Sequence, residues 1–135
     1  MADNLFKLKI ISPERTFYEG EVTMFECRTT EGEIGILKNH IPLTAVLAPG
    51  VARIMEPDKE NAKAALISGF IEILQDEVTV LAEIAEWPDD FDVKRAEEAK
   101  IRAQRRLQEK ATGTNLARAT LALQRSIARI EAAKK

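Results

Sequence analysis

The first two thirds of the chain alternate between short apolar runs and turn residues. Phe6, Leu8 and Ile10 are separated by lysines, which is typical of a half-buried strand. Similar apolar runs occupy residues 21–30, 34–37, 43–47, 51–55, 62–67, 70–75 and 77–83. Turn residues such as Glu31-Gly32 and Pro49-Gly50 separate these runs. Eight short strands with no helix-length segment between them predict an antiparallel sandwich or barrel.

The pattern becomes helical after Trp87-Pro88. Residues 92–111 contain neither Pro nor Gly, and Ala, Arg, Glu and Gln dominate them, which predicts a helix capped by Asp92. A second helix is predicted over residues 116–133, and two helices joined by so short a link form an antiparallel hairpin. The predicted organisation is an N-terminal antiparallel β-sandwich over residues 1–86, a linker over 87–91 and a C-terminal antiparallel two-helix hairpin over 92–135.

The two predicted helices have unequal apolar stripes. The second helix begins at a cap provided by Thr114 or Asn115. Its stripe consists of Leu116, Ala119, Leu123, Ile127 and Ile130. The stripe of the first helix consists of Val93, Ala96, Ala99 or Lys100, Ala103 and Leu107. Apolar burial stabilises by about 25 cal/mol per Å², whereas ordering the backbone costs about 1 to 2 kcal/mol per residue. An alanine-rich seam therefore predicts a marginally stable hairpin that can change its docking or extend; a permanently packed hairpin is the alternative.

The charge is unevenly distributed along the chain. The 20 basic and 22 acidic side chains give a formal net charge of −2. Residues 1–91 nevertheless carry 8 basic and 17 acidic side chains, whereas residues 92–135 carry 12 and 5. The basic hairpin is therefore attracted both to its own acidic body and to any acidic partner. Two attractive positions are what a two-position switch requires.

The candidates for catalysis and metal binding are few. Cys27 is the single cysteine, which excludes an intrachain disulfide and a multi-cysteine zinc site and suits a reducing cytosol. It lies in a predicted strand and is expected to be buried. His40 is the single histidine, so no second imidazole completes a metal site. The sequence also contains no membrane-spanning apolar run and no secretory signal. We therefore predict no catalytic site, no metal site and no required cofactor.

Arginines recur at helical spacing in the hairpin. Arg95 and Arg102 share a helix face with Asp92, because they lie about one and three turns after it. The second helix carries Arg118, Arg125 and Arg129 at spacings of seven and four residues. If the two faces converge, their guanidinium groups are suited to a triphosphate or an acidic helix. A solvated basic face and a nucleic-acid site are the alternatives. Against nucleic acid, the hairpin lacks stacking aromatics beyond Phe91, and the acidic body repels phosphate.

Four segments together resemble one known family. They are IISPERTFYEGEV (residues 10–22), EGEIGILKNHIPL (31–43), ISGFIEI (67–73) and EVTVLAEIAE (77–86). Their order and spacing are similar to those of ε subunits of bacterial F-type ATP synthases, and the resemblance covers nearly the whole chain. It implies a β-sandwich followed by a helical hairpin. It also implies a non-catalytic rotor subunit of the central stalk, which helps to couple proton flow to ATP synthesis.

The resemblance also implies partners for each part of the chain. The sandwich would bind the γ subunit and the c-ring, with Glu33 and His40 as c-ring contacts. Contact with the membrane would be only through the complex, at the cytoplasmic face of the bacterial cell membrane. The hairpin would extend into the α/β catalytic head and inhibit ATP hydrolysis there. Its contacts with the β subunits would be Arg118, Arg125 and Arg129.

Some members of this family bind ATP in the folded state through an Ile/Leu-Asp-x-x-Arg-Ala motif. The matching stretch is FDVKRA, in which Phe91 replaces the Ile or Leu. The family pattern places the ATP site at Glu86, Phe91, Asp92, Arg95, Ala96, Arg102, Arg125 and Arg129. ATP would then be a regulatory ligand. A module whose main role is ATP sensing is the alternative to a rotor subunit with inhibitory control.

Overall fold

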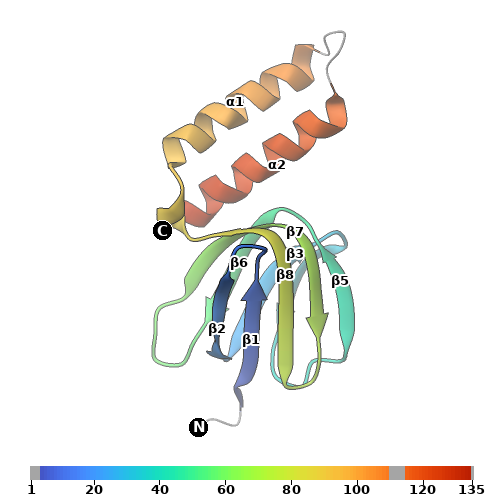
Figure 1. Cartoon of the computed structure of the whole chain (residues 1–135), viewed down its shortest axis with the longest axis vertical. Helices are drawn as coiled ribbons and strands as arrows, with labels where there is room; N and C mark the ends of the chain where they lie inside the picture. Colours follow the sequence, from blue (N-terminus) through green and yellow to red (C-terminus); the bar gives the residue numbers. More distant parts are fainter. Residues whose placement is uncertain (1–3, 110–114, 135) are drawn as a thin grey trace.

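The N-terminal part of the chain is built from strands. The computed structural model describes residues 4–109 and 115–134. Within the first of these ranges the strands are β1 (Phe6–Ile11), β2 (Thr16–Val22), β3 (Met24–Thr29), β4 (Gly32–Ile36), β5 (Leu43–Leu47), β6 (Gly50–Met55), β7 (Ala62–Ile73) and β8 (Glu77–Glu86). They curl around a shared interior below the two helices (Figure 1).

Strand pairing confirms the predicted β-sandwich. The order is β2-β1-β8-β7-β5-β3-β4, and β6 pairs with both β3 and β7. Neighbouring strands are antiparallel with one exception among the described residues: β1 and β8 are parallel, with Leu8 opposite Val78. Because β7 is long, it pairs with β8 along one edge and with β6 and β5 in succession along the other.

Alternate strand residues form an aliphatic core. Its largest fully buried side chains include Leu8, Ile10, Phe25, Ile54, Ile71 and Val80. Cys27 is buried in this core, as predicted, with 2% of its surface exposed. Burial raises the pKa of the Cys27 thiol to about 12, because an apolar environment solvates a thiolate poorly. The thiol is therefore protonated and unreactive at neutral pH.

The sequence pattern does not predict β2 as a separate strand. Glu19 and Gly20 interrupt its apolar alternation, and its last residues are predicted to continue into β3. In the structure β2 pairs antiparallel with β1, with Tyr18 opposite Ile10. The strand therefore forms because a partner is available, and pairing outweighs its weak local pattern.

The sequence pattern also divides β7 in two. Residues 62–67 and 70–75 are predicted as separate strands with a turn at Ser68-Gly69. The structure has one continuous strand, which pairs with β6 before this site and with β5 after it. Ser68 and Gly69 have positive φ angles of 60° and 131°. The turn residues therefore mark a local distortion at which β7 changes partner.

Gly69→Ala is expected to destabilise the sandwich by about 2 to 3 kcal/mol. A Cβ at this position would overlap the carbonyl oxygen of Leu81, and the φ angle of +131° is strained for any side chain. Urea unfolding measures the change in the free energy of unfolding. Gly32→Ala is the matched control, because Gly32 has a φ angle of +120° but open space around its Cα. Equal losses in the two variants would contradict the role assigned to the Leu81 contact.

Two helices follow the sandwich. A short turn of helix, η2 (Pro88–Asp90), leads to α1 (Val93–Glu109) and α2 (Leu116–Ala133). The predicted cap is confirmed at Asp92, whose Oδ1 accepts a bond from the Lys94 amide at 2.9 Å. Asn115 caps α2 by accepting from the Arg118 amide at 3.0 Å. The predicted end of the first helix at residue 111, and the alternative cap Thr114, lie outside the described residues.

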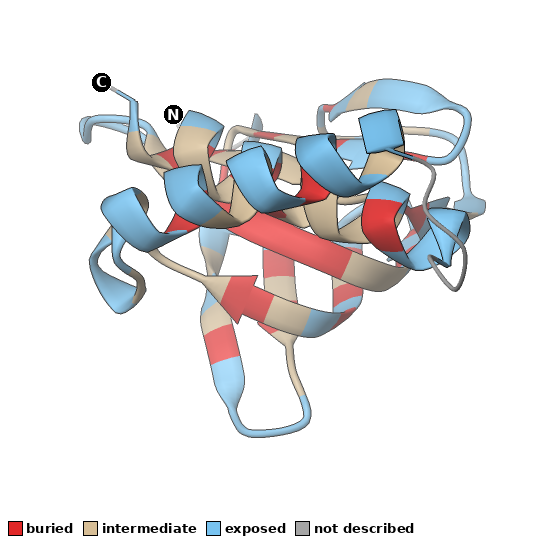
Figure 2. Ribbon diagram, turned by 90° about the horizontal axis from the view of Figure 1, so that it is seen from above, coloured by how far each residue is buried: buried red, intermediate tan, exposed pale blue. Residues whose placement is uncertain are grey.

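The helices pack in layers on the sandwich. Helix α2 contacts β6 and β7, and α1 packs against the far side of α2 (Figure 1). The outward surface of the hairpin is mostly exposed (Figure 2). Within the described residues, no helix is long and apolar enough to span a membrane.

The buried side chains of the hairpin are small. In the described part of the hairpin the buried side chains are Ala96, Ala103, Ala119, Ser126, Ala128 and Ala132. The predicted stripe is wrong at Leu116 and Ile127, which are 47% and 37% exposed. Ala119 of the predicted stripe is buried, Leu123 and Ile130 are half-buried, and Ser126, which lies outside the stripe, is buried as well. No large apolar side chain is therefore fully buried in the described hairpin.

Candidate functional site

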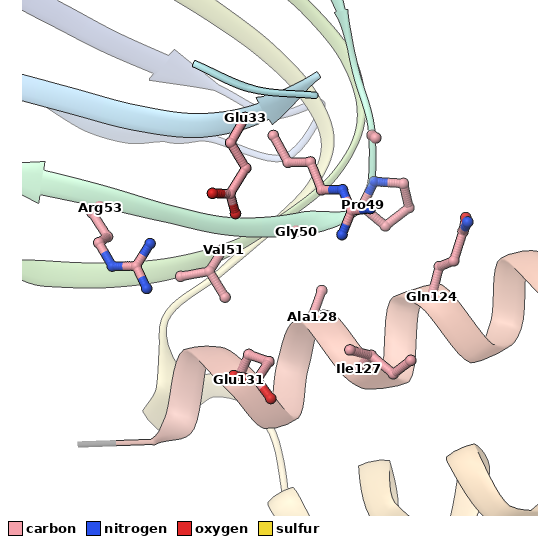
Figure 3. A pocket seen from close by; sticks show the side chains of 11 residues that line it. Glu33, Pro49, Gly50, Val51, Arg53, Gln124, Ile127, Ala128 and Glu131 are labelled. Atoms are coloured by element: carbon pink, nitrogen blue, oxygen red, sulfur yellow. The ribbon is translucent and has the colours of Figure 1, made fainter. Parts of the chain in front are cut away.

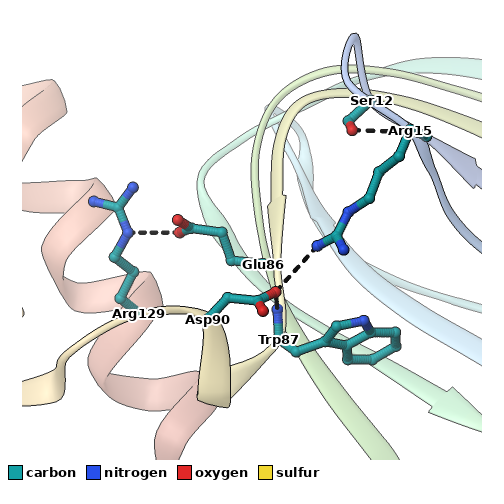
Figure 4. Close-up of polar contacts among 6 residues, drawn as sticks. All are labelled: Ser12, Arg15, Glu86, Trp87, Asp90 and Arg129. Atoms are coloured by element: carbon teal, nitrogen blue, oxygen red, sulfur yellow. Dashed lines mark hydrogen bonds and ion pairs between the residues drawn. The ribbon is translucent and has the colours of Figure 1, made fainter.

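The start of the predicted linker is attached to the sandwich. The Trp87 ring stacks on Phe17 of β2, with ring centroids 4.3 Å apart. Asp90 Oδ2 accepts bonds from the Trp87 amide at 2.9 Å and from Arg15 Nη2 at 3.2 Å (Figure 4). Residues 87–90 therefore remain part of the sandwich surface, and the free segment before α1 begins at Phe91.

Few polar contacts join α2 to the sandwich. Arg129 Nε donates to Glu86 Oε1 at 2.7 Å, and both side chains are about three-quarters buried (Figure 4). Lys63 Nζ donates to the backbone oxygen of Lys134 at 3.0 Å. The buried alanines of α2 supply little apolar area to this contact. Docking of the hairpin therefore depends on small apolar contacts and on two polar contacts that can be exchanged for others.

Arginines line one side of the hairpin. In both helices an arginine directly precedes a buried residue of the hairpin seam. The pairs are Arg95-Ala96, Arg102-Ala103, Arg118-Ala119 and Arg125-Ser126. Because the helices are antiparallel, the position that precedes the seam lies on the same side of the hairpin in both. Arg129 follows Arg125 by one turn and contacts Glu86 of the sandwich, so this is the side that turns toward the end of β8.

The guanidinium groups on this side are mostly without partners. Arg125 is half-buried, and its Nε is shielded from solvent yet forms no hydrogen bond within the described residues. The side chains of Arg95 and Arg102 are exposed and form no hydrogen bond or ion pair with other residues in the described ranges. A buried donor without a partner costs about 1 to 3 kcal/mol. An anionic ligand would accept a hydrogen bond from Arg125 Nε and would attract the guanidinium groups of Arg95 and Arg102.

The residues of the predicted ATP site lie at the end of β8, in the segment before α1 and on both helices. Glu86 and Arg129 are in direct contact, whereas Asp92 caps α1 and Ala96 is buried in the seam. Phe91 is half-buried at the start of the free segment. A cavity of about 410 Å³ lies beside Glu86 and Arg129; it is also lined by Arg15, Glu83 and Asp90. Sequence reasoning missed Arg15 and Asp90, because no local pattern links two residues that are 75 positions apart.

The predicted c-ring residues lie apart from each other. Glu33 in β4 lines a cavity against α2. His40 lies in the loop after β4, where its Nδ1 is 2.7 Å from the backbone oxygen of Ile41. The Asn39 amide in that loop donates to the Gln75 oxygen at 2.8 Å, so the loop lies at the β7–β8 turn. The structure therefore does not gather Glu33 and His40 into one site.

An exposed apolar row crosses the sandwich. Val46, Phe70 and Leu81 are neighbours on β5, β7 and β8, because Phe70 is in register with both others. They are 45%, 55% and 51% exposed. The alternation of apolar and polar residues in the sequence did not distinguish these exposed residues from core residues, because it does not show which strands pair with one another. Contiguous exposed apolar side chains of this kind mark an interaction surface.

A sandwich with an exposed apolar row, carrying a hairpin that presents unpaired arginines, defines a protein that works through contacts with other chains. Comparisons with known proteins identify a family in which such a chain is a subunit of a larger complex. The β-sandwich domain of the ATP synthase delta/epsilon chain matches residues 5–88, and the long α-helix domain of that chain matches residues 89–134. The chain belongs to the family of ATP synthase delta/epsilon chains. It is an epsilon-type, non-catalytic chain, as the sequence resemblance predicts.

Relatives match over nearly the full length. The ATP synthase epsilon chain of Clostridium novyi is 45% identical over 93% of this chain and 95% of its own. That of Syntrophomonas wolfei is 43% identical over 100% of this chain and 98% of its own. The fold is also similar to a chain in the cryo-EM structure of Euglena gracilis mitochondrial ATP synthase (OSCP/F1/c-ring), with a TM-score of 0.83 at 21% identity over 96% of this chain and 81% of that one. A chain of the Tetrahymena thermophila central stalk and c-ring has a TM-score of 0.61 at 14% identity, and 96% of each chain is covered.

Proposed function

We propose that the chain is a rotor subunit of the central stalk that helps to couple proton flow to ATP synthesis and inhibits ATP hydrolysis through its hairpin. It acts peripherally, at the cytoplasmic face of the bacterial cell membrane. The observation that carries this proposal is the docked hairpin, whose described buried side chains are all small. Such a hairpin can leave the sandwich at low cost while each helix persists through its own propensity.

The sandwich supplies the contacts within the stalk. The γ subunit packs on the apolar row of Val46, Phe70 and Leu81, which is an exposed apolar surface that a stable partner would cover. His40, in its polar loop, contacts the c-ring. Glu33 of β4, which is exposed while the hairpin is docked, also contacts the c-ring.

The extended hairpin enters the α/β head. There Arg118, Arg125 and Arg129 contact the acidic part of the β subunits. Extension breaks the ion pair between Arg129 and Glu86 and replaces it with pairs to the new partner. Residues 92–135 carry 12 basic and 5 acidic side chains, which supports an acidic destination.

ATP is the regulatory ligand of the docked state. Its phosphates are bound by Arg95, Arg102 and Arg125, and it satisfies the buried Nε of Arg125. Because ATP binds the docked form, a concentration of about 100 times its Kd stabilises that form by about 2.7 kcal/mol. The unpaired arginines also support the second candidate function, in which ATP sensing is the main role of the chain.

Phe70→Glu is expected to reduce co-purification with the γ subunit at least tenfold. The substitution places a charge in the centre of the apolar row, where a packed partner would have to desolvate it. Ile101→Glu is the matched control, because Ile101 of α1 is 54% exposed and Phe70 is 55% exposed. Circular dichroism checks that both variants are folded. Undiminished association of Phe70→Glu would contradict the assignment of this surface to the γ subunit.

A further inference from the structure

A cavity of about 300 Å³ lies between α2 and the sandwich (Figure 3). On the sandwich side it is bounded by β3, β4, β6 and the turn between β5 and β6. The side chains that define its chemistry are Arg28, Glu33, Val51, Arg53, Ala128 and Glu131. One wall is α2, so this cavity, which is open to solvent on one side, exists only while the hairpin is docked.

The cavity lies apart from the arginine side of the hairpin. Helix α2 contributes Gln124, Ile127, Ala128 and Glu131 to it, whereas Arg125 and Arg129 are absent from its lining. Residues 124, 128 and 131 share one flank of the helix, because they are spaced by four and three positions. The cavity and the proposed ATP site are therefore on different flanks of α2.

The charged groups of the lining are two guanidinium groups and two carboxylates. Arg28 and Arg53 form no side-chain hydrogen bond or ion pair with any residue in 4–109 or 115–134. Glu131 is already paired with Lys134, whose Nζ lies 2.9 Å from its Oε1. The nearby Lys134, and to a smaller extent Lys100 and Lys63, lower the pKa of Glu131. Glu33 lies opposite Arg28 on the neighbouring strand, and Glu26 lies opposite Arg53, yet neither carboxylate forms an ion pair with these guanidinium groups within the described residues.

Apolar side chains lie among the charged ones in the lining. Val51 of the sandwich and Ile127 and Ala128 of α2 lie on either side of the cavity (Figure 3). Small-molecule sites combine apolar walls with a few convergent polar groups and begin at about 300 Å³. The planar guanidinium group binds carboxylate oxygens in pairs. The cavity is therefore suited to a compact molecule with one apolar end and one anionic end.

We propose that this cavity binds a small organic carboxylate, held by Arg28 and Arg53 with its apolar body between Val51 and Ala128, and that the bound molecule stabilises the docked hairpin. The ligand contacts both walls, so it binds the docked form and not the extended one. It therefore shifts the hairpin toward docking by its differential affinity for the two forms. This site goes beyond the proposed function and does not depend on ATP binding.

Titration of the ¹⁵N-labelled full chain with benzoate tests the site. Saturable amide shifts are expected around Val51 and Ala128, with affinity reduced at least tenfold by Arg53→Gln and by Arg28→Gln. Arg105→Gln is the control, because Arg105 is an exposed arginine of α1 outside the cavity. Inorganic phosphate, which lacks an apolar body, is expected to bind at least tenfold more weakly. Absence of saturable shifts, equal loss in the control, or equal binding of phosphate would each overturn the site as proposed.

Saturating ATP separates this site from the proposed ATP site. Benzoate is expected to bind as tightly, or more tightly, when ATP is present, since both ligands favour docking. Displacement of benzoate by ATP would overturn the proposal. Failure of ATP to bind at all would instead count against the proposed ATP site and leave the benzoate result standing.

Spin labels report the effect on docking. The labels are attached at Glu60→Cys, in the loop between β6 and β7, and Thr120→Cys, on α2; both positions are exposed. The native Cys27 is buried and does not react. Benzoate is expected to increase the share of the short, docked distance in double electron–electron resonance. An unchanged distribution under saturating benzoate would overturn the coupling to the hairpin.

Discussion

Truncation after Asp90 is expected to raise ATP hydrolysis by the assembled complex several-fold, while the shortened chain still assembles. The large fully buried side chains all belong to the sandwich, so its core survives removal of residues 91–135. Ending the chain at Asp90 keeps the contacts of Trp87 with Phe17 and of Asp90 with Arg15. Hydrolysis by the complex with the full chain and with the truncated chain is compared at equal occupancy of the subunit.

Single arginine substitutions in the full chain test which charged side chains of the hairpin inhibit ATP hydrolysis. If the extended hairpin acts through its arginines, Arg118→Ala raises hydrolysis in the same direction as truncation. Arg118 is chosen because it is not one of the arginines proposed to bind ATP in the docked state. Arg105→Ala is the matched control, because this exposed arginine does not precede a buried seam residue. Unchanged hydrolysis after truncation, at full assembly, would show that the hairpin is not inhibitory.

ATP binding by the isolated chain is expected to weaken roughly ten- to hundredfold in Arg95→Ala and in Arg125→Ala. A hydrogen bond to a charged group contributes about 1.5 to 3 kcal/mol, which corresponds to this range. The effect of Arg125→Ala is expected to be the larger one, because its Nε is already desolvated and lacks a partner within the described residues. Isothermal titration calorimetry measures both affinities.

The controls separate ATP binding from general effects of charge. Arg105→Ala removes the same charge from an exposed position of α1 and should leave the affinity within about twofold. Asp92→Asn keeps the capping oxygen of α1 but removes its negative charge, so any loss in this variant reflects the ligand and not fraying of the helix. No saturable binding at millimolar ATP, or equal losses in all four variants, would count against the ATP site.

Local features of the chain were predictable because they depend on neighbouring residues. Apolar alternation in Phe6, Leu8 and Ile10 predicts β1, and the absence of Pro and Gly after residue 91 predicts α1. The cap at Asp92 follows from its side-chain oxygen and its position before the helix. Burial of Cys27 follows from its place in a strand. The division into sandwich and hairpin, and the opposite charges of the two parts, were therefore set by the sequence alone.

Tertiary structure decided which of these elements meet. Residues 16–22 form the strand β2 because they pair with β1. Two predicted strands form the single strand β7, with a local distortion at Gly69. Tertiary structure also left Leu116 and Ile127 of the predicted stripe exposed, paired Arg129 with Glu86 and left the row around Phe70 exposed. The ion pair joins residues 43 positions apart, and no local pattern encodes such a separation. The sequence by itself determined the elements and their charge, whereas packing between distant residues decided which of their faces are buried, paired or free to bind.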